Sequence, residues 1–291
     1  MTIKNLFAKS ATAEKVSEGL DLSDRTILVT GCNSGLGFET MRVLASRGAR
    51  VLGTARTKIL AKKACAQIMG DAVPLSCELS EPGSIRAAID AVQEPLHAIV
   101  ANAGVMALQE KSVMHGTEAH MFINHVSHFM LVNGLRDQLT PNGRVVVLSS
   151  GAHAYARGKN LDFEDLGWNR PYKPWVAYGY SKLANILFVR ELARRLPKGQ
   201  TANALHPGIV DTGLWRYLPE DNATKMKNSF SLKSTEQGAA TSVFLAAHPA
   251  VANISGEYFN NCSIAKPSAH AGDEKLGKRL WELSEELVAT L

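Results

Sequence analysis

The sequence predicts an α/β fold in which a single doubly wound domain carries a parallel seven-stranded sheet flanked by helices. Short β-branched runs alternate along the 291-residue chain with longer helical patterns, which is typical of βαβ units. The early strand runs lack polar alternation, as expected when helices cover both faces of a sheet. No repeat, low-complexity segment or linker interrupts the pattern. We therefore expect an N-terminal extension over residues 1–22 and one domain over 23–291.

The expected strands are short apolar runs that lie between helical patterns or glycine-rich turns. In chain order they lie at residues 26–30, 49–55, 72–79, 96–101, 143–150, 201–208 and 256–260. The helix at 36–48 follows a glycine-rich turn directly after the first strand. The remaining helices are expected near residues 58–68, 82–93, 112–138, 177–196, 235–247 and 273–289. On a sheet of this kind, ligands bind beyond the carboxyl ends of the strands.

Composition and charge narrow the classes of function. The net charge is +5, and the basic residues are scattered rather than clustered, which argues against binding to nucleic acid. Four cysteines without CxxC or metal-type spacing indicate a reduced protein, expected in the cytoplasm. No apolar run approaches the roughly 18 residues needed to cross a bilayer. The N-terminus lacks a signal-peptide core and is expected to form a short amphipathic helix that packs on the domain surface.

The segment TGCNSGLG at residues 30–37 joins the first strand to the first helix. Its glycines allow a tight turn, close approach of a pyrophosphate and packing of the helix on the sheet, while the N–H groups at the helix start face the phosphates. This predicts a Rossmann-type dinucleotide site that includes Gly31, Asn33, Ser34, Gly35, Leu36 and Gly37. The spacing is GxxxGxG, which resembles the TGxxxGxG motif of the short-chain dehydrogenase/reductase family.

The end of the second strand, GTARTK, predicts the choice of cofactor. Ala55 stands where family members that use NAD carry an aspartate, and Arg56 follows it. No carboxylate repels a 2′-phosphate there, and a guanidinium is present to bind one. NADP(H) is therefore the expected cofactor. The alternative interpretation of Arg56 is an ordinary solvated arginine at a strand end.

The segment YGYSK contains two tyrosines, of which only Tyr178 is spaced to share a helix face with Lys182. Tyr180, two residues before the lysine, points elsewhere. A neighbouring ammonium is expected to lower the pKa of Tyr178, which would then exchange a proton with a carbonyl or an alcohol. Alone, such a pair is usually an ordinary helix surface.

Other positions match the same family. Ser149-Ser150 ends the fifth strand, and the resemblance assigns to Ser150 the hydroxyl that binds the substrate oxygen. The resemblance also implies that Asn124 holds a water that links the lysine to solvent, and that Lys182 holds the hydroxyls of the nicotinamide ribose. The resemblance thus implies a catalytic set of Tyr178, Lys182, Ser150 and Asn124.

The resemblance also implies further cofactor contacts, two of which depart from the usual pattern. Glu78-Leu79 replaces the usual Asp-Leu beside the adenine, and the NNAG motif appears here with alanine in first place. The implied contacts are Glu78, Leu79, Asn102, Ala103, Gly104, Tyr178, Lys182, Pro207, Gly208, Val210 and Thr212.

The segment between Ser150 and Tyr178 is long and aromatic, and its pattern resembles the retinol dehydrogenase-like and WW-domain oxidoreductase-like branch. Residues 211–233 are expected to form a lid, with Leu214, Trp215 and Tyr217 toward a lipophilic or aromatic substrate. Ser150 and Tyr178 complete the expected substrate site. The chain is compatible with a monomer or a homo-oligomer. His120, His125 and His128 lie close together, but no further ligand completes a metal site, so none is expected.

The function expected from these features is NADP(H)-dependent interconversion of a carbonyl and an alcohol. Two alternatives remain. One is reduction of a carbon–carbon double bond, as in the protochlorophyllide reductase relatives, and the other is a nucleotide-sensing regulator without turnover. Retention of the four catalytic positions argues against the regulator.

Overall fold

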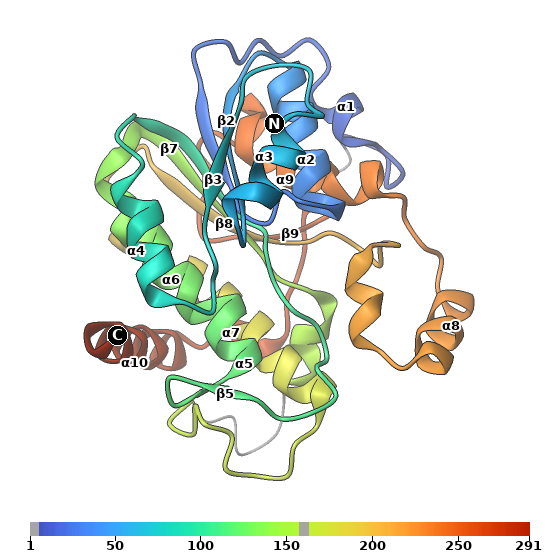
Figure 1. Ribbon diagram of the computed structural model, residues 1–291, viewed down its shortest axis with the longest axis vertical. Coiled ribbons are helices and arrows are strands. Elements are labelled where there is room, and N and C mark those ends of the chain that lie inside the picture. The colour runs from blue at the N-terminus through green and yellow to red at the C-terminus, as the bar shows by residue number, and fades with distance from the viewer. Residues whose placement is uncertain (1–5, 157–162) are drawn as a thin grey trace.

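The computed structural model describes residues 6–156 and 163–291. The first five residues of the expected N-terminal extension and residues 157–162 of the insert before Tyr178 lie outside this part of the chain. Within it, the main sheet has eight strands in the order β10-β9-β8-β7-β4-β1-β2-β3, with helices on both faces (Figure 1). All neighbouring strands are parallel except β9 and β10. The predicted α/β class is confirmed.

The elements lie close to their predicted positions. The strands of the main sheet are β1 (Thr26–Val29), β2 (Arg50–Ala55), β3 (Ala72–Ser76), β4 (Leu96–Ala101), β7 (Leu139–Leu148), β8 (Thr201–His206), β9 (Tyr258–Asn260) and β10 (Ser263–Ile264). The α-helices of eight or more residues are α2 (Gly35–Ser46), α3 (Lys58–Cys65), α4 (Pro82–Asp90), α6 (Ser127–Gly134), α7 (Pro174–Arg195), α8 (Glu220–Ser229), α9 (Thr235–Ala247) and α10 (Glu274–Thr290).

The predicted count of seven strands is wrong by one. β10 pairs antiparallel with β9 after a tight turn in which Asn261 and Cys262 have φ of 53° and 55°. Two consecutive left-handed residues are what a two-residue hairpin turn requires. β10 is only two residues long, so no apolar pattern announced it.

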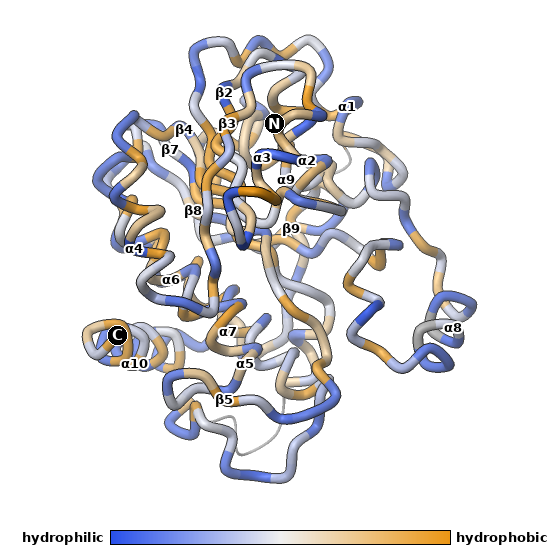
Figure 2. The backbone as a smooth tube through the Cα atoms, in the orientation of Figure 1, coloured by the Kyte–Doolittle hydropathy of each residue, from blue (hydrophilic) through white to orange (hydrophobic). Residues whose placement is uncertain are grey.

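Both faces of the sheet are apolar because successive side chains of a strand point to opposite sides. In β1, Leu28 packs into the core formed with α4, α6 and α7, whereas Ile27 and Val29 pack into the core formed with α2 and α9. The hydrophobic residues accordingly follow the strands (Figure 2). The short helix α1 (Ala13–Val16) packs on α9, and α10 packs on α7 at the outer surface. This accounts for the absence of polar alternation in the sequence.

The predicted single helix over residues 112–138 is wrong. Its first part is a hairpin of β5 (Val113–Met114) and β6 (Thr117–Glu118), turned by His115 and Gly116 with φ of 50° and 75°. The helix then begins as α5 (Ala119–Met121), widens into a π-helical turn (Phe122–Val126) and continues as α6. A 3-10 turn (Arg136–Gln138) follows and leads into β7, which begins four residues earlier than predicted. Strands of two residues on either side of this turn are too short to show an alternating pattern in the sequence.

The topology places a binding crevice. The chain moves outward from β1 through β2 to β3 and then returns to β4, on the other side of β1. Loops that leave the carboxyl ends of β1 and β4 therefore diverge in opposite directions. This divergence is where ligands bind in open α/β sheets.

Buried neutral histidines should make the fold sensitive to acid. Burial lowers the pKa of His125 to about 3 and the pKa values of His128 and His206 to about 4. Between these values and the ordinary pKa near 6.5, the unfolded chain binds protons that the folded chain does not, so acidification favours unfolding. As the pH decreases from about 6.5, we expect the free energy of unfolding to decrease. The loss should be roughly 3 kcal/mol for each histidine once the pH reaches about 4.

Urea unfolding followed at about pH 7 and about pH 5 checks this expectation. His128→Gln, which cannot titrate in this range, should flatten the decline. A free energy of unfolding that does not change between the two pH values would contradict the assignment of neutral buried histidines.

Candidate active site

A cavity of about 330 Å³ lies at the carboxyl ends of the central strands. The predicted site residues that line it are Gly31, Asn33, Ser34, Gly35, Leu36, Gly37, Arg56, Glu78, Leu79, Asn102, Ala103, Gly104, Thr212 and Leu214. The predicted residues that do not line it are Ser150, Asn124, Tyr178, Lys182, Pro207, Gly208, Val210 and Trp215. The cavity is therefore built mainly by the residues assigned to the cofactor.

Several lining residues were not predicted. They include Val105, Ile123, and Met114 from the β5–β6 hairpin. Val105 and Ile123 are direct neighbours of Gly104 and Asn124, so their place next to predicted motifs was the available signal. Met114 was not predicted because the sequence predicts a helix over residues 112–138, where the structure has the hairpin.

The glycine-rich turn has separate steric reasons for its glycines. Gly31 has φ +73°, and a Cβ placed on it would lie 2.9 Å from the Cβ of Ala103. Gly37 lies within α2, where a Cβ would lie 2.5 Å from Asn102 Nδ2 and would also collide with the carbonyl oxygen of Gly31. Any side chain there would push α2 away from the turn. The first N–H groups of α2 consequently lie at the cavity, where they can bind an anion.

Arg56 stands at the cavity where β2 ends. Ala55 is buried in the strand, and the exposed Arg56 lines the cavity beside it. Within residues 6–156 and 163–291, Arg56 has no carboxylate within salt-bridge distance. Glu78, the residue that replaces the usual aspartate, turns its carboxylate back to accept the N–H of Ser80 at 3.2 Å. Arg56 is thus a cation at this end of the cavity that no carboxylate of the described residues pairs with.

Asn102 is tied to the end of β1 through Thr30. The N–H groups of Asn102 and Ala103 both donate to Thr30 Oγ1 at 2.9 Å, and Asn102 Nδ2 donates to the Thr30 carbonyl at 2.7 Å. Thr30 Oγ1 also lies 3.0 Å from His128 Nε2. These contacts join β1, β4 and α6 although alanine occupies the first position of the NNAG motif. Asn102 Oδ1 is buried and has no partner within the described part of the chain.

Tyr178 and Lys182 are both buried on α7, and Lys182 Nζ lies 5.7 Å from the centre of the Tyr178 ring. Lys182 Nζ donates to the carbonyl of Leu148, at the end of β7. Ser149 Oγ donates to the Lys182 carbonyl at 2.7 Å, which fixes α7 against β7. Ser149 is thereby engaged with the backbone, and the Ser150 hydroxyl hydrogen-bonds Tyr178. The structure thus brings the serine, tyrosine and lysine of the predicted set together.

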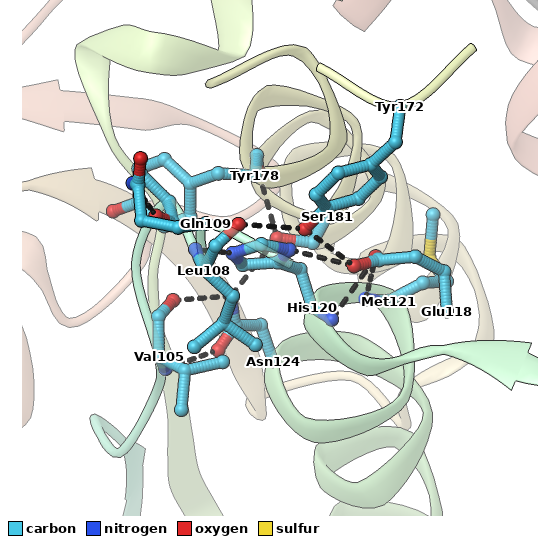
Figure 3. Close-up of polar contacts among 11 residues, drawn as sticks. Val105, Leu108, Gln109, Glu118, His120, Met121, Asn124, Tyr172, Tyr178 and Ser181 are labelled. Carbon is cyan, nitrogen blue, oxygen red and sulfur yellow. Dashed lines mark hydrogen bonds and ion pairs between the residues drawn. The ribbon is translucent and has the colours of Figure 1, made fainter. Parts of the chain in front are cut away.

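Asn124 lies in the π-helical turn and contacts α7 through Ser181, the residue before Lys182 (Figure 3). Its Nδ2 donates to Ser181 Oγ at 2.9 Å and to the Val105 carbonyl at 3.0 Å, while its Oδ1 accepts the Val105 N–H at 2.8 Å. The π turn adds one residue to a helical turn and so changes which side chains face inward, a device often found at functional sites.

The predicted effect of Lys182 on Tyr178 is wrong for this structure. Burial raises the pKa of Tyr178 to about 12, against a smaller lowering by the Ser150 hydrogen bond. Burial also lowers the pKa of Lys182 to about 7, because its ammonium is removed from water. Burial is thus the largest influence on both groups. Tyr178 keeps its proton at neutral pH.

Tyr180 points away from the site, as its spacing predicted. Its ring packs against Phe163 at 5.9 Å and Trp168 at 5.2 Å between ring centres. Tyr178 instead contacts Trp175 and His120, with ring centres at 6.0 and 5.9 Å.

The expected lid contains a 3-10 turn (Gly213–Tyr217) and α8, which stands apart from the body of the domain (Figure 1). Leu214 and Tyr217 line the cavity. Trp215, expected beside the substrate, is buried against Ala107 and Leu218 and donates its Nε1–H to the Val210 carbonyl at 2.9 Å. Trp215 therefore anchors the lid, and its neighbours contact the cavity.

The segment that follows β8 packs against the two ends of the lid. Gly208 has φ +94°, and a Cβ there would lie 2.8 Å from Lys233 Cδ. Val210 forms a β-bridge with Lys233, and Thr212 Oγ1 accepts the N–H of Leu214 at 3.4 Å. Thr212 lies opposite Gly35, close to where a Cβ on that glycine would be.

Across residues 6–156 and 163–291, no helix has the length and apolar character needed to cross a membrane. The same residues contain no cluster of three histidine, cysteine, aspartate or glutamate side chains placed to hold a metal ion.

Comparison with known proteins places these features in context. The family model for short chain dehydrogenases matches residues 25–160. The chain is 35% identical to "Short-chain dehydrogenase TIC 32 B, chloroplastic" of Brassica napus, covering 99% of this chain and 96% of that protein. It is 36% identical to the WW domain-containing oxidoreductase of Homo sapiens, covering 99% of this chain and 73% of that protein. Retinol dehydrogenase 12 of Mus musculus is 37% identical, with 99% and 92% covered.

Solved structures agree with the observed architecture. An uncharacterised protein from Mycobacterium paratuberculosis is 32% identical, with a TM-score of 0.76 over 94% of this chain and 97% of that one. A short chain dehydrogenase from Burkholderia cenocepacia in complex with NADP has the same fold, with 24% identity and a TM-score of 0.65 over 82% of this chain and 96% of that one. The relatives include a retinol dehydrogenase and a WW domain-containing oxidoreductase, the two kinds of protein that the sequence resembles.

Proposed function

The chain belongs to the short-chain dehydrogenase/reductase family, and from this we propose that it is an NADP(H)-dependent oxidoreductase that interconverts a carbonyl and an alcohol. One observation carries the proposal. A buried tyrosine that is protonated at neutral pH hydrogen-bonds a serine hydroxyl beside a cavity lined by the residues assigned to the dinucleotide. A carbonyl oxygen placed between Tyr178 and Ser150 would meet two hydroxyl donors.

The residues of the cavity fit a nicotinamide dinucleotide phosphate. Gly31 and Gly37 let the turn, α2 and the Asn102-Ala103 segment pack closely, and both line the cavity where the first N–H groups of α2 can bind an anion. Asn102 Oδ1 is a buried acceptor that lacks a partner in the described chain. The exposed Arg56 guanidinium suits a 2′-phosphate. The NADP complex of the Burkholderia cenocepacia structure, which has the same fold, agrees with this choice.

The chain's own residues would handle the proton and the orientation of the substrate. A bound nicotinamide supplies or accepts the hydride at the carbinol carbon. Tyr178, which carries its proton at neutral pH, donates it to the carbonyl oxygen during reduction. Ser150 stabilises negative charge as it develops on that oxygen. Lys182, with a pKa of about 7, contributes part of a positive charge beside the tyrosine at neutral pH. These roles favour carbonyl reduction at neutral pH.

The substrate is proposed to be lipophilic or aromatic. Leu214, Ile123, Leu148 and Met114 line the cavity, and apolar walls bind apolar ligands. Retinol dehydrogenase 12 is named for a lipophilic alcohol, which agrees with this class.

Benzylideneacetone tests the reaction type in one assay, because it offers both a carbonyl and a carbon–carbon double bond. We expect NADPH to be consumed, measured by its absorbance, and the unsaturated alcohol to be the product. A saturated ketone as product would instead establish reduction of the double bond. All-trans-retinal and cyclohexanone extend the comparison to other apolar carbonyls. Binding of NADPH without turnover of any of them would favour a nucleotide-sensing regulator.

A further inference from the structure

The segment from Val105 to Leu108, which we call the wall, meets the cavity through Val105 and is held by side chains at two points. Val105 lines the cavity and exchanges two hydrogen bonds with the Asn124 amide. Leu108 donates its N–H to His120 Nε2 at 3.0 Å. His120 and Asn124 lie four residues apart, at adjacent turns of one helical run. One helix therefore holds both ends of the wall (Figure 3).

Glu118 determines how His120 holds Leu108. Both side chains are buried, and His120 Nδ1 lies 2.8 Å from Glu118 Oε1. Because Nε2 accepts the Leu108 N–H, the proton of the neutral imidazole is on Nδ1 and is donated to the carboxylate. The carboxylate thereby selects the tautomer that can accept from Leu108. Its other oxygen accepts the N–H groups of His120 at 3.0 Å and Met121 at 3.2 Å, which caps the helix.

Tyr172, from the insert before α7, binds the carbonyl of Leu108. Its hydroxyl donates to the Leu108 carbonyl at 2.9 Å and lies 3.4 Å from Glu118 Oε1. Burial and the adjacent Glu118 charge raise the pKa of Tyr172, so its hydroxyl remains a donor at physiological pH. Both backbone polar groups of Leu108, its N–H and its carbonyl, are thus bound by side chains rather than by a regular helix or strand.

The wall also contacts the lid. Ala107 is fully buried with φ +45°, and it packs with Trp215 and Leu218 of the lid. A left-handed conformation at a non-glycine residue costs about 1–2 kcal/mol and persists only where its surroundings maintain it. The hydrogen bonds on Leu108 provide that support from the next residue.

We propose that Glu118, His120 and Tyr172 are positioning residues that hold the wall Val105–Leu108 between the catalytic helix α7 and the lid, and so set the alignment of the substrate. The proposal rests on the carbonyl/alcohol function proposed above and deepens it. None of the three side chains lines the cavity, so they act through the wall. Their loss should weaken substrate binding without affecting cofactor binding.

Glu118→Gln changes the network with a minimal change of shape. An amide has one accepting oxygen and one donating nitrogen. If the oxygen keeps the two N–H groups at the helix start, the nitrogen faces His120 Nδ1 and forces the proton onto Nε2. The Nε2–H of His120 and the N–H of Leu108 are then two donors that face each other, and the hydrogen bond between them is lost. In the reverse orientation, the amide nitrogen would face the N–H groups of His120 and Met121, and both of those hydrogen bonds would be lost instead of the one at Leu108.

Backbone hydrogen exchange, followed by NMR in the full chain, tests the tautomer directly and requires no turnover. In Glu118→Gln we expect the Leu108 N–H to exchange about tenfold faster or more, because it loses its acceptor. The Val105 N–H, held by Asn124, should exchange at the unaltered rate and is the internal control. Unchanged exchange at Leu108 would overturn the proposed role of Glu118.

Steady-state kinetics with benzylideneacetone test the consequence. We expect Glu118→Gln to raise KM about tenfold, with kcat and the Kd for NADPH within about twofold of their unaltered values. Tyr172→Phe, which keeps the ring against Trp168, should raise KM in the same direction and serves if Glu118→Gln folds poorly.

Ser284→Ala is the matched control, because it removes a buried hydrogen bond of 2.9 Å to another histidine of the same helical run, His125, which does not contact Leu108. It should lower stability and leave KM unchanged. Equal KM in Glu118→Gln, Tyr172→Phe and the unaltered protein would overturn the positioning role. If the unaltered protein reduces no carbonyl, the proposed function fails, and the exchange experiment still decides whether the network holds Leu108.

Discussion

Tyr178→Phe is expected to lower the kcat for carbonyl reduction by roughly 10²- to 10⁴-fold, the usual contribution of a positioned general acid. The substitution removes one oxygen from a buried ring and leaves its packing against Trp175 and His120 in place. The Ser150 hydroxyl can still hydrogen-bond the carbonyl oxygen, but the hydroxyl that would transfer a proton to that oxygen is gone. Affinity for NADPH should change little, because the cavity that would hold the dinucleotide is built by other residues.

Tyr180→Phe provides the control, since Tyr180 lies on the same helix and packs against Phe163 and Trp168. It should retain the full kcat. Initial rates with benzylideneacetone and fluorescence titration with NADPH measure the two effects separately. If Tyr178→Phe retains its kcat, Tyr178 is not the proton donor.

Arg56→Ala is expected to weaken NADPH binding by about 10- to 100-fold, which corresponds to the loss of a hydrogen-bonded charge pair worth about 1.5–3 kcal/mol. The exposed guanidinium has no carboxylate partner among the described residues, so its removal should leave no unpaired charge. NADH lacks the 2′-phosphate, and its Kd should therefore remain nearly constant.

Lys62→Ala removes the same unit charge from α3, at an exposed position that does not line the cavity. It should weaken NADPH only slightly. Isothermal titration with both cofactors at low and high salt would measure these differences. Equal losses for NADPH and NADH in Arg56→Ala would contradict a contact with the 2′-phosphate.

Local patterns predicted much of the fold. The runs that became β1, β2 and β4 are apolar on both faces because helices pack on both sides, and this pattern can be read without coordinates. The glycine turn at residues 30–37 was recognisable from its place between a strand and a helix. The pairing of Tyr178 with Lys182, and the opposite orientation of Tyr180, followed from helical periodicity alone.

Other elements could not be predicted because their signals are short or depend on distant residues. The hairpin at 113–118 and the strand β10 have strands of two residues, too short for a detectable period. The π turn around Asn124 looks like an ordinary helix in sequence. Trp215 is apolar enough for either a substrate wall or a core, and only its contacts with Ala107 and Val210 distinguish the two.

Protonation states show most clearly the difference between what the sequence determines and what the tertiary structure determines. Which residues meet was largely decided by spacing along a helix or by the end of a strand, and these are properties of a few neighbouring residues. The pKa of Tyr178 depends on how much water the whole fold excludes, and burial moved it upward where the adjacent lysine alone would have moved it down. The tautomer of His120 likewise depends on Glu118 and Leu108 meeting in three dimensions. Desolvation and hydrogen bonding sum over residues far apart in the chain, so only the tertiary structure could decide them.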